Sequence, residues 1–200
     1  GHTVQLLGQS DSATAVTGDI VVLAVPYPAV SAVIAERGNT LAGKIVVDIT
    51  NPLNFETFDS LTVSADSSAT AEIAEALPAS RVLKAFNTTF AATLAVGSVG
   101  SLPTTVLIAG DDADAKSTLA GVITSGGLNA IDAGPLKRAR ELEDPLGARV
   151  DRPVERVTEA GEPLARSSCP PGELRGDGRR ITTVLYLGPA LLEERRARLS

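Results

Sequence analysis

The stretch Asp19-Ile-Val-Val-Leu-Ala-Val25, followed by Pro26-Tyr27-Pro28, decides the fold class of this chain. A second run, Lys44-Ile-Val-Val-Asp-Ile49, is followed by Thr50-Asn51-Pro52. Both runs are short, unbroken and rich in β-branched residues, which is typical of central strands in a parallel sheet that is covered on both faces. Residues 29–37, between the two runs, have the length of a helix. The order strand, helix, strand predicts an α/β fold with a doubly wound, Rossmann-type parallel sheet in three αβα layers.

The same alternation continues to about residue 143. Beyond it the composition changes, because residues 144–200 hold ten Arg, no Lys and six of the twelve prolines. We therefore expect one domain over residues 1–143 and an atypical Arg/Pro-rich tail over 144–200 that is largely disordered or loosely packed. Within that tail, residues 181–187 could form a strand and residues 190–199 an Arg/Glu-rich helix. Further strands are expected at 3–7, 81–86, 104–109 and 128–133, and further helices at 68–77, 90–96, 110–125 and 136–143.

Composition excludes several classes of function. The formal net charge is −6, and no cluster of Lys and Arg stands beside stacking aromatics, so no nucleic-acid partner is expected. The apolar runs are far shorter than the roughly 20 residues that cross a bilayer, so no membrane partner is expected either. A single cysteine, Cys169, and a single histidine, His2, argue against a disulfide, a metal centre or a Ser-His-Asp triad. We assign no catalytic and no metal-binding residue, and we expect a cytoplasmic protein.

Polar or proline turns follow three of the expected strands, at Val25-Pro26-Tyr27, Thr50-Asn51-Pro52 and Asn87-Thr88. Ligands of doubly wound sheets bind just past the carboxyl ends of the strands. Pro26 would leave a flat apolar ledge there, and an amide side chain suits a ring that bears a carboxamide, such as nicotinamide. Proline, Asn and Thr are also ordinary turn and cap formers, so a purely structural role stays open.

A further candidate is Gly8-Gln9-Ser10, which follows the strand at residues 3–7. In dinucleotide folds an acidic residue after the second strand selects NAD, whereas small polar or basic residues accept the 2′-phosphate of NADP. Gln9 and Ser10 are neutral, although Asp11 stands one place later. No Gly-x-Gly-x-x-Gly follows a strand anywhere in the sequence, so the usual cradle for the pyrophosphate is missing.

Six stretches together resemble the coenzyme F420-dependent NADP oxidoreductase family. They are DIVVLAVPYPAV (19–30), GKIVVDITNPLNFETFDSL (43–61), DSSATAEIAEALP (66–78), RVLKAFNTTFAATL (81–94), VLIAGDDADAK (106–116) and IDAGPLKRARELE (131–143). The resemblance implies a Rossmann domain that binds NADP(H), usually in a homodimer, and that passes a hydride between NADPH and the deazaflavin F420. Members begin with a strand, a glycine-rich loop and a helix ending in Gly-His. This chain opens at Gly1-His2, so we expect its sheet to lack the first β-α unit.

The resulting hypothesis is an NADP-dependent oxidoreductase that acts on a small-molecule cofactor substrate of the F420 type. Nicotinamide would lie over the strand ends near Pro26, Asn51 and Asn87, where proximity and orientation supply most of the rate. Two alternatives stay open: a degraded, non-catalytic nucleotide-binding module, and a reductase of the same fold with another small substrate. The expected cofactor-binding residues are Gly8, Gln9, Ser10, Val25, Pro26, Tyr27, Thr50, Asn51, Pro52, Asn87 and Thr88.

Overall fold

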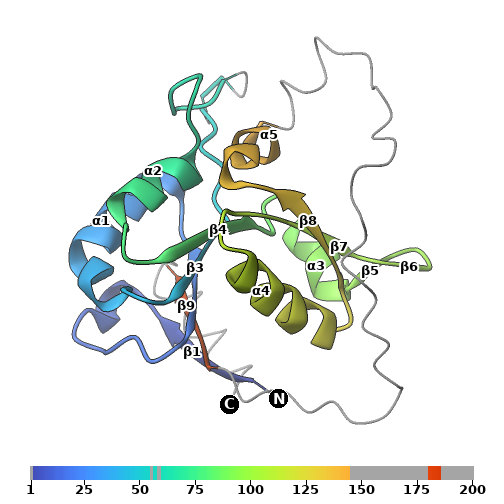
Figure 1. Cartoon of the computed structure of the whole chain (residues 1–200), viewed down its shortest axis with the longest axis horizontal. Helices are drawn as coiled ribbons and strands as arrows, with labels where there is room; N and C mark the ends of the chain where they lie inside the picture. Colours follow the sequence, from blue (N-terminus) through green and yellow to red (C-terminus); the bar gives the residue numbers. More distant parts are fainter. Residues whose placement is uncertain (1, 55, 58–59, 145–179, 186–200) are drawn as a thin grey trace.

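The computed structural model describes residues 2–54, 56–57, 60–144 and 180–185. Over these residues the chain forms a seven-stranded sheet in the order β1-β9-β2-β3-β4-β7-β8, with helices packed against it (Figure 1). The α/β, Rossmann-type fold predicted from the sequence is confirmed. The strands are β1 (Thr3–Leu7), β2 (Ile20–Ala24), β3 (Ile45–Asp48), β4 (Arg81–Ala85), β7 (Thr105–Ala109), β8 (Asn129–Gly134) and β9 (Arg180–Leu185).

The sheet is mostly parallel, with one antiparallel junction that the sequence did not predict. Strands β1, β9, β2, β3 and β4 run parallel, whereas β7 pairs with β4 in the antiparallel sense and β8 runs parallel to β7. Between β4 and β7 lie helix α3 (Ala91–Val96) and a hairpin of β5 (Ser98–Val99) and β6 (Leu102–Pro103). Helix α3 spans only about 9 Å, and the hairpin returns on itself, so neither carries the chain back to the amino edge of β4.

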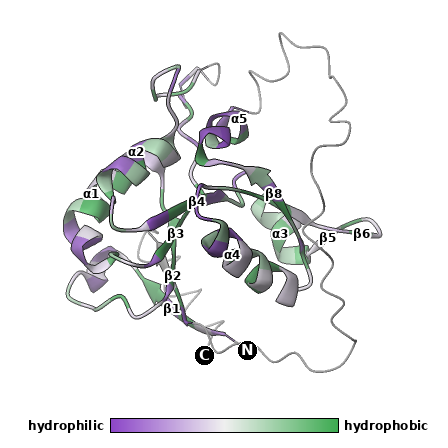
Figure 2. Ribbon diagram, in the orientation of Figure 1, coloured by the Kyte–Doolittle hydropathy of each residue, from purple (hydrophilic) through white to green (hydrophobic). Residues whose placement is uncertain are grey.

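Three layers result, because alternate residues of the central strands enter two separate apolar clusters. Val21, Leu23 and Val46 pack with helices α1 (Tyr27–Arg37) and α2 (Ala69–Ala76) on one face. Ile20, Ile45 and Val47 pack with helix α4 (Ala113–Ser125) on the other face. Figure 2 shows a mixture of apolar and polar residues along α1 and α2, as expected for helices with one buried side.

Helix boundaries follow the capping signals in the sequence. The Ser68 hydroxyl accepts a hydrogen bond from the Ala71 amide at 3.0 Å, and the Asp112 carboxylate accepts one from the Ala115 amide at 2.7 Å. Gly97 ends α3 with a left-handed φ of 76°. After β8, a short 3₁₀ turn leads into helix α5 (Ala139–Glu143). These local signals place α2, α3 and α4 close to where they were predicted.

The tail contributes one described element. The strand predicted within residues 181–187 is present as β9, and it lies between β1 and β2 instead of at an edge of the sheet. The expectation of a disordered or loosely packed tail concerns residues 145–179 and 186–200, which lie outside the described residues. The helix expected near the end of the chain lies outside them as well.

Candidate functional site at the carboxyl ends of strands β2, β3 and β4

Two of the predicted amide side chains meet at the carboxyl edge of the sheet. Because β3 and β4 are parallel neighbours, the residues that follow them lie side by side. Asn87 Nδ2 donates to Asn51 Oδ1 at 2.9 Å, and Asn51 Nδ2 donates to the Asn87 carbonyl oxygen at 3.3 Å. The structure therefore brings together the turns after β3 and β4, as the sequence predicted, and ties them to each other.

Asn87 is held in one orientation. Its Nδ2 also donates to the Leu142 carbonyl oxygen of α5 at 2.8 Å, so the donor side of the amide is engaged twice. Its Oδ1, by contrast, is a buried acceptor with no hydrogen-bond partner. Buried polar atoms are nearly always paired, so an orphan in a fixed orientation marks a place where a ligand group can bind.

Thr50 carries the second buried polar atom that has no hydrogen-bond partner. Its side chain is only 4% exposed, and its Oγ1 has no partner. Its backbone is clamped on both sides, since its amide donates to Asp48 Oδ1 at 2.8 Å and its carbonyl oxygen accepts from Lys84 Nζ at 2.5 Å. The hydroxyl is thus positioned by its own backbone while remaining available as a donor.

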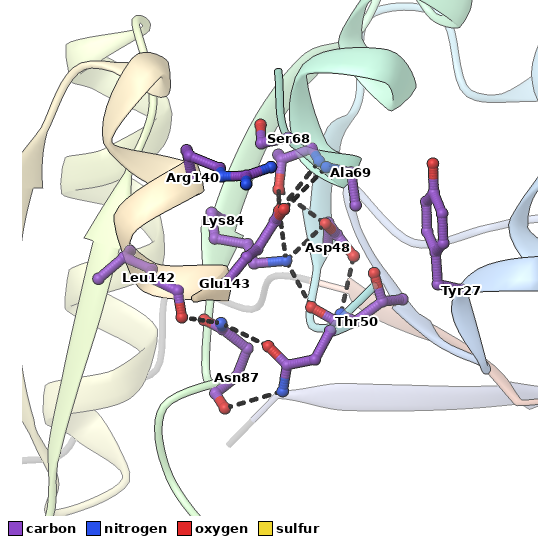
Figure 3. A network of polar contacts seen from close by, with 12 residues as sticks. Tyr27, Asp48, Thr50, Ser68, Ala69, Lys84, Asn87, Arg140, Leu142 and Glu143 are labelled. Atoms are coloured by element: carbon purple, nitrogen blue, oxygen red, sulfur yellow. Dashed lines mark hydrogen bonds and ion pairs between the residues drawn. The ribbon is translucent and has the colours of Figure 1, made fainter. Parts of the chain in front are cut away.

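A fully buried ionic network lies beneath these two residues (Figure 3). Asp48 and Lys84 are paired in register across β3 and β4, and Lys84 Nζ lies 2.8 Å from Asp48 Oδ2. The same ammonium lies 3.0 Å from Glu143 Oε1 at the end of α5. The Thr70 hydroxyl lies 2.7 Å from Asp48 Oδ2 and 3.0 Å from Glu143 Oε1, so it is placed to donate its proton to either carboxylate. Paired and hydrogen-bonded in this way, the buried charges are tolerated.

Glu143 also completes the start of α2. Its carboxylate oxygens accept from the backbone amides of Ala69 at 2.8 Å and Thr70 at 3.2 Å. The first amides of a helix have no partner within the helix and carry partial positive charge, so a carboxylate is favourable there. The site thus joins β3, β4, α2 and α5 through one acidic side chain.

Asp48 lies inside β3 and is a fully buried carboxylate. The sequence did not predict the roles of Lys84, Glu143 and Thr70. One signal was present: Lys84 interrupts the apolar strand RVLKAF, and a charge inside a buried strand needs a partner. The partner's identity depends on the register of β3 with β4, which the sequence does not display.

Backbone strain also marks the edge. Phe86, between β4 and Asn87, has a φ of 66°, and it is the one non-glycine residue with positive φ in the described part of the chain. A bulky side chain is unfavourable in this left-handed conformation. The energetic cost of this backbone conformation at Phe86 is a further indication that the surrounding structure imposes the position of Asn87.

The proline turn after β2 lies at the same edge of the sheet, but its residues differ in how deeply they are buried. Val25 is buried in the apolar core, while Pro26 is exposed and precedes the first residue of α1. The Tyr27 hydroxyl donates to the Glu72 carboxylate of α2. Burial, this hydrogen bond and the charges of nearby carboxylates raise the pKa of Tyr27 well above its ordinary value of 10. Tyr27 is therefore a neutral phenol at physiological pH.

Two other predicted residues of this edge differ in exposure: Pro52 is buried and Thr88 is exposed. The segment after β1 is separate, because β9 lies between β1 and β2. There the Gly8 amide donates to Asp11 Oδ2 at 2.8 Å, while Gln9 and Ser10 are exposed. The buried guanidinium of Arg37 donates to the carbonyl oxygens of Asp11 and Thr14, at 2.6 and 2.9 Å. The Arg37 guanidinium is therefore held by its hydrogen bonds to the loop backbone.

Over the described residues, no group of three or more His, Cys, Asp or Glu side chains could hold a metal ion. Nor does this part of the chain contain a helix of sufficient length and apolarity to cross a membrane.

Comparison with known proteins agrees with the fold. Residues 3–52 match the family described as NADP oxidoreductase, coenzyme F420-dependent. The F420-dependent NADP reductase of Methanocaldococcus jannaschii is 29% identical over 147 residues, which cover 72% of this chain and 66% of the relative. The metalloreductase STEAP3 of Rattus norvegicus is 37% identical over 103 residues, 52% of this chain but only 20% of that protein.

Two solved structures share the fold. A proposed F420-dependent NADP reductase from Arthrobacter sp. FB24 superposes with a TM-score of 0.58 at 32% identity, covering 65% of this chain and 61% of that one. The hypothetical protein SMa0349 from Sinorhizobium meliloti gives a TM-score of 0.53 at 32% identity, with 60% and 58% covered. This chain therefore spans at most about two thirds of each of these four relatives.

The sheet defines a Rossmann-type α/β protein. The comparisons support the resemblance of this chain to the F420-dependent NADP oxidoreductase family that its sequence indicated. The family name implies two cofactors, NADP and F420. The orphaned Thr50 hydroxyl and Asn87 carbonyl fit the carboxamide of nicotinamide, which offers one acceptor and one donor. No glycine-rich phosphate loop is found in the described residues, so the fit concerns the nicotinamide end.

Proposed function

We propose that this chain is an NADP-dependent oxidoreductase that transfers a hydride between NADP(H) and a deazaflavin of the F420 type. The observation that carries the proposal is the pair of orphaned polar atoms, Thr50 Oγ1 and Asn87 Oδ1, at the carboxyl ends of β3 and β4. In doubly wound sheets this edge is where a dinucleotide lies. The similarity of the chain to the F420-dependent NADP oxidoreductase family supports NADP and F420 as the two reactants.

Each orphan has a definite task in this proposal. The Thr50 hydroxyl would donate to the carboxamide oxygen, and Asn87 Oδ1 would accept from the carboxamide N–H. Both groups are held before the ligand arrives, Thr50 by Asp48 and Lys84, and Asn87 by Asn51 and Leu142. Binding then costs little side-chain entropy, which favours a single orientation of the ring.

When bound, NADPH supplies the hydride itself, and the protein has to align the donor ring with the acceptor ring. Such a transfer needs little acid or base catalysis, so the neutral groups of this edge are sufficient. Tyr27 stays protonated and bound to Glu72, which places a neutral phenol beside the edge. Val25, Pro26, Pro52 and Thr88 complete the set of residues proposed to contact the cofactor, and Gly8, Gln9 and Ser10 the set proposed for its adenosine side.

We propose that residues 1–143, together with strand β9 that lies within their sheet, form the nucleotide-binding domain, and that it works as a homodimer in the cytoplasm. Support for a partner copy comes from four exposed apolar side chains on α3 and the β5–β6 hairpin. Such a concentration of exposed apolar surface is typical of an interface. These residues are Phe90 (84% exposed), Val96 (73%), Val99 (64%) and Leu102 (70%).

A second candidate is a reductase with another acceptor. It is favoured by the 37% identity to metalloreductase STEAP3 over 103 residues, because that protein carries a different acceptor specificity in its name. A non-catalytic nucleotide-binding module is the third candidate.

One assay separates the three candidates. The purified full chain is mixed with NADPH and either F420 or a chelated ferric ion, and the oxidised deazaflavin or the ferrous product is followed by absorbance. Loss of the deazaflavin absorbance, dependent on both NADPH and protein, is expected. Ferric reduction without F420 turnover would favour the second candidate. Binding of NADPH with no turnover of either acceptor would favour the third.

A further inference from the structure

We propose that β9 serves as the central strand of the nucleotide-binding sheet, and that the sheet is completed only when residues 180–185 insert between β1 and β2. In the usual doubly wound order, 3-2-1-4-5-6, the strand that begins the chain lies in the middle, with parallel neighbours on both sides. Here β9 has parallel neighbours on both sides, β1 and β2, so it occupies a central place of this kind among the described strands.

The register shows that β9 is a full member of the sheet. Five residues of β1 pair with Arg180 to Val184, and five residues of β2 pair with Ile181 to Leu185. Strands β1 and β2 do not pair with each other, although they follow one another in the chain. In the order of the sheet, β9 lies between them.

Side chains anchor β9 at the start of β2. Thr182 is fully buried, and its hydroxyl accepts from the Gly18 amide at 2.7 Å and donates to Gln5 Oε1 at 2.8 Å. Gln5 Oε1 accepts in addition from the Thr17 amide at 3.0 Å. One hydroxyl of β9 therefore links β1 to the segment that leads into β2.

The contact with Thr182 requires a residue without a side chain at Gly18. A Cβ at this position would lie 2.4 Å from the Thr182 amide nitrogen and 2.5 Å from Thr182 Oγ1, distances that real Cβ atoms do not show. Next to it, the Asp19 amide donates to the Arg180 carbonyl oxygen at 2.7 Å, and an Arg180 guanidinium nitrogen lies 3.8 Å from the Asp19 carboxylate. Residues 17–19 thus form the contact surface for β9, although the two segments are far apart in the sequence.

The consequence concerns β1 most. Among the described strands β1 pairs with β9 alone, so without β9 it has no place in the sheet, and β2 presents an open edge. The loop of Gly8, Gln9 and Ser10 would then lose its position relative to the rest of the carboxyl edge. Nucleotide binding, if the proposed function holds, therefore depends on the C-terminal segment.

The test compares the full chain with two variants, a chain that stops after Arg179 and the full chain with Gly18→Val. Gly121→Ala in the full chain is the matched control, because a Cβ at Gly121 meets nothing within 4 Å. Hydrogen exchange of the β1, β2 and β3 amides is measured in all four proteins, with NADPH binding as a separate readout. We expect exchange in β1 to accelerate by about tenfold or more in both variants, and the control to match the unchanged chain.

Each outcome of this experiment either supports or overturns the role proposed for β9. Faster exchange confined to β1 and β2, or unfolding of both variants while Gly121→Ala stays folded, supports the central role of β9. Unchanged protection of β1 in the chain that stops after Arg179 would overturn it. If exchange changes as expected but none of the four proteins binds NADPH, the proposed function fails and the role of β9 in the sheet stands.

Discussion

Lys84 in β4 and Glu143 at the end of α5 form a buried ion pair, with Lys84 Nζ 3.0 Å from Glu143 Oε1 and neither side chain exposed. The pair locks α5 onto the sheet directly behind the candidate site. Since Leu142, the neighbour of Glu143, accepts from the Asn87 amide, the position of α5 also sets the orientation of Asn87. The stability of the fold and the geometry of the site are thus coupled through one carboxylate.

Replacing Glu143 by Gln should therefore destabilise the protein strongly. The change removes one charge of a buried network and weakens the cap of α2, and breaking such a pair costs about 3–5 kcal/mol. Urea unfolding measures the loss. Glu141→Gln is the control, because Glu141 pairs with Arg138 at the surface and such pairs contribute about 1 kcal/mol or less. Equal losses in the two variants would contradict the assigned role of Glu143.

Thr50→Val should separate stability from function. The Thr50 hydroxyl has no partner, so valine removes a buried unsatisfied group without breaking a hydrogen bond. The free energy of unfolding should stay the same or rise by about 1 kcal/mol. Binding of NADP(H), measured by calorimetry, should weaken about threefold to tenfold, the value of one hydrogen bond. A marked loss of stability with unchanged binding would show that the hydroxyl has a structural role instead.

Tyr27 should remain neutral in alkaline solution. The folded state raises its pKa, so the fold favours the protonated phenol. This contribution to stability is complete below pH 10 and is lost as the pH rises toward the folded pKa. The ultraviolet spectrum of the unchanged chain minus that of Tyr27→Phe should show no phenolate band at about pH 11. A phenolate band that appears with a midpoint near pH 10 would refute the contact with Glu72.

The apolar patch on α3 and the hairpin should control assembly. Phe90→Ser removes its most exposed aromatic side chain. We expect the unchanged chain to be a dimer by light scattering and the variant to shift toward monomer. Val4→Ser, an exposed apolar position on β1, serves as the control and should leave the dimer unchanged. A monomer in the unchanged chain, or a dimer unaffected by Phe90→Ser, would exclude this surface.

Much of the fold follows from local sequence signals. The β-branched runs before Pro26 and Thr50 form β2 and β3, and Ser68, Asp112 and Gly97 set helix ends within a residue or two of their expected places. These features depend on residues that are close together in the chain, so the sequence alone is enough to predict them. The meeting of Asn51 and Asn87 was also predictable, because parallel adjacent strands end at one edge.

The features that escaped prediction depend on partners distant in the sequence. Nothing in the apolar pattern of residues 181–185 says that they insert between β1 and β2, since that choice rests on the fit of Thr182 against Gly18. The antiparallel β7 follows from the shortness of α3. Glu143 reads as one acid in an Arg/Glu-rich helix, and only the packed structure brings it to Lys84.

The most direct test of the central claim, that the edge after β3 and β4 holds nicotinamide, is a titration followed by nuclear magnetic resonance. The side-chain amide signals of Asn51 and Asn87 are recorded in the full chain with NADP⁺ and, separately, with the adenosine bisphosphate half of the cofactor. The account predicts that NADP⁺ shifts both signals and that the adenosine half alone leaves them in place. Binding of NADP⁺ that leaves both side-chain signals unmoved would contradict it.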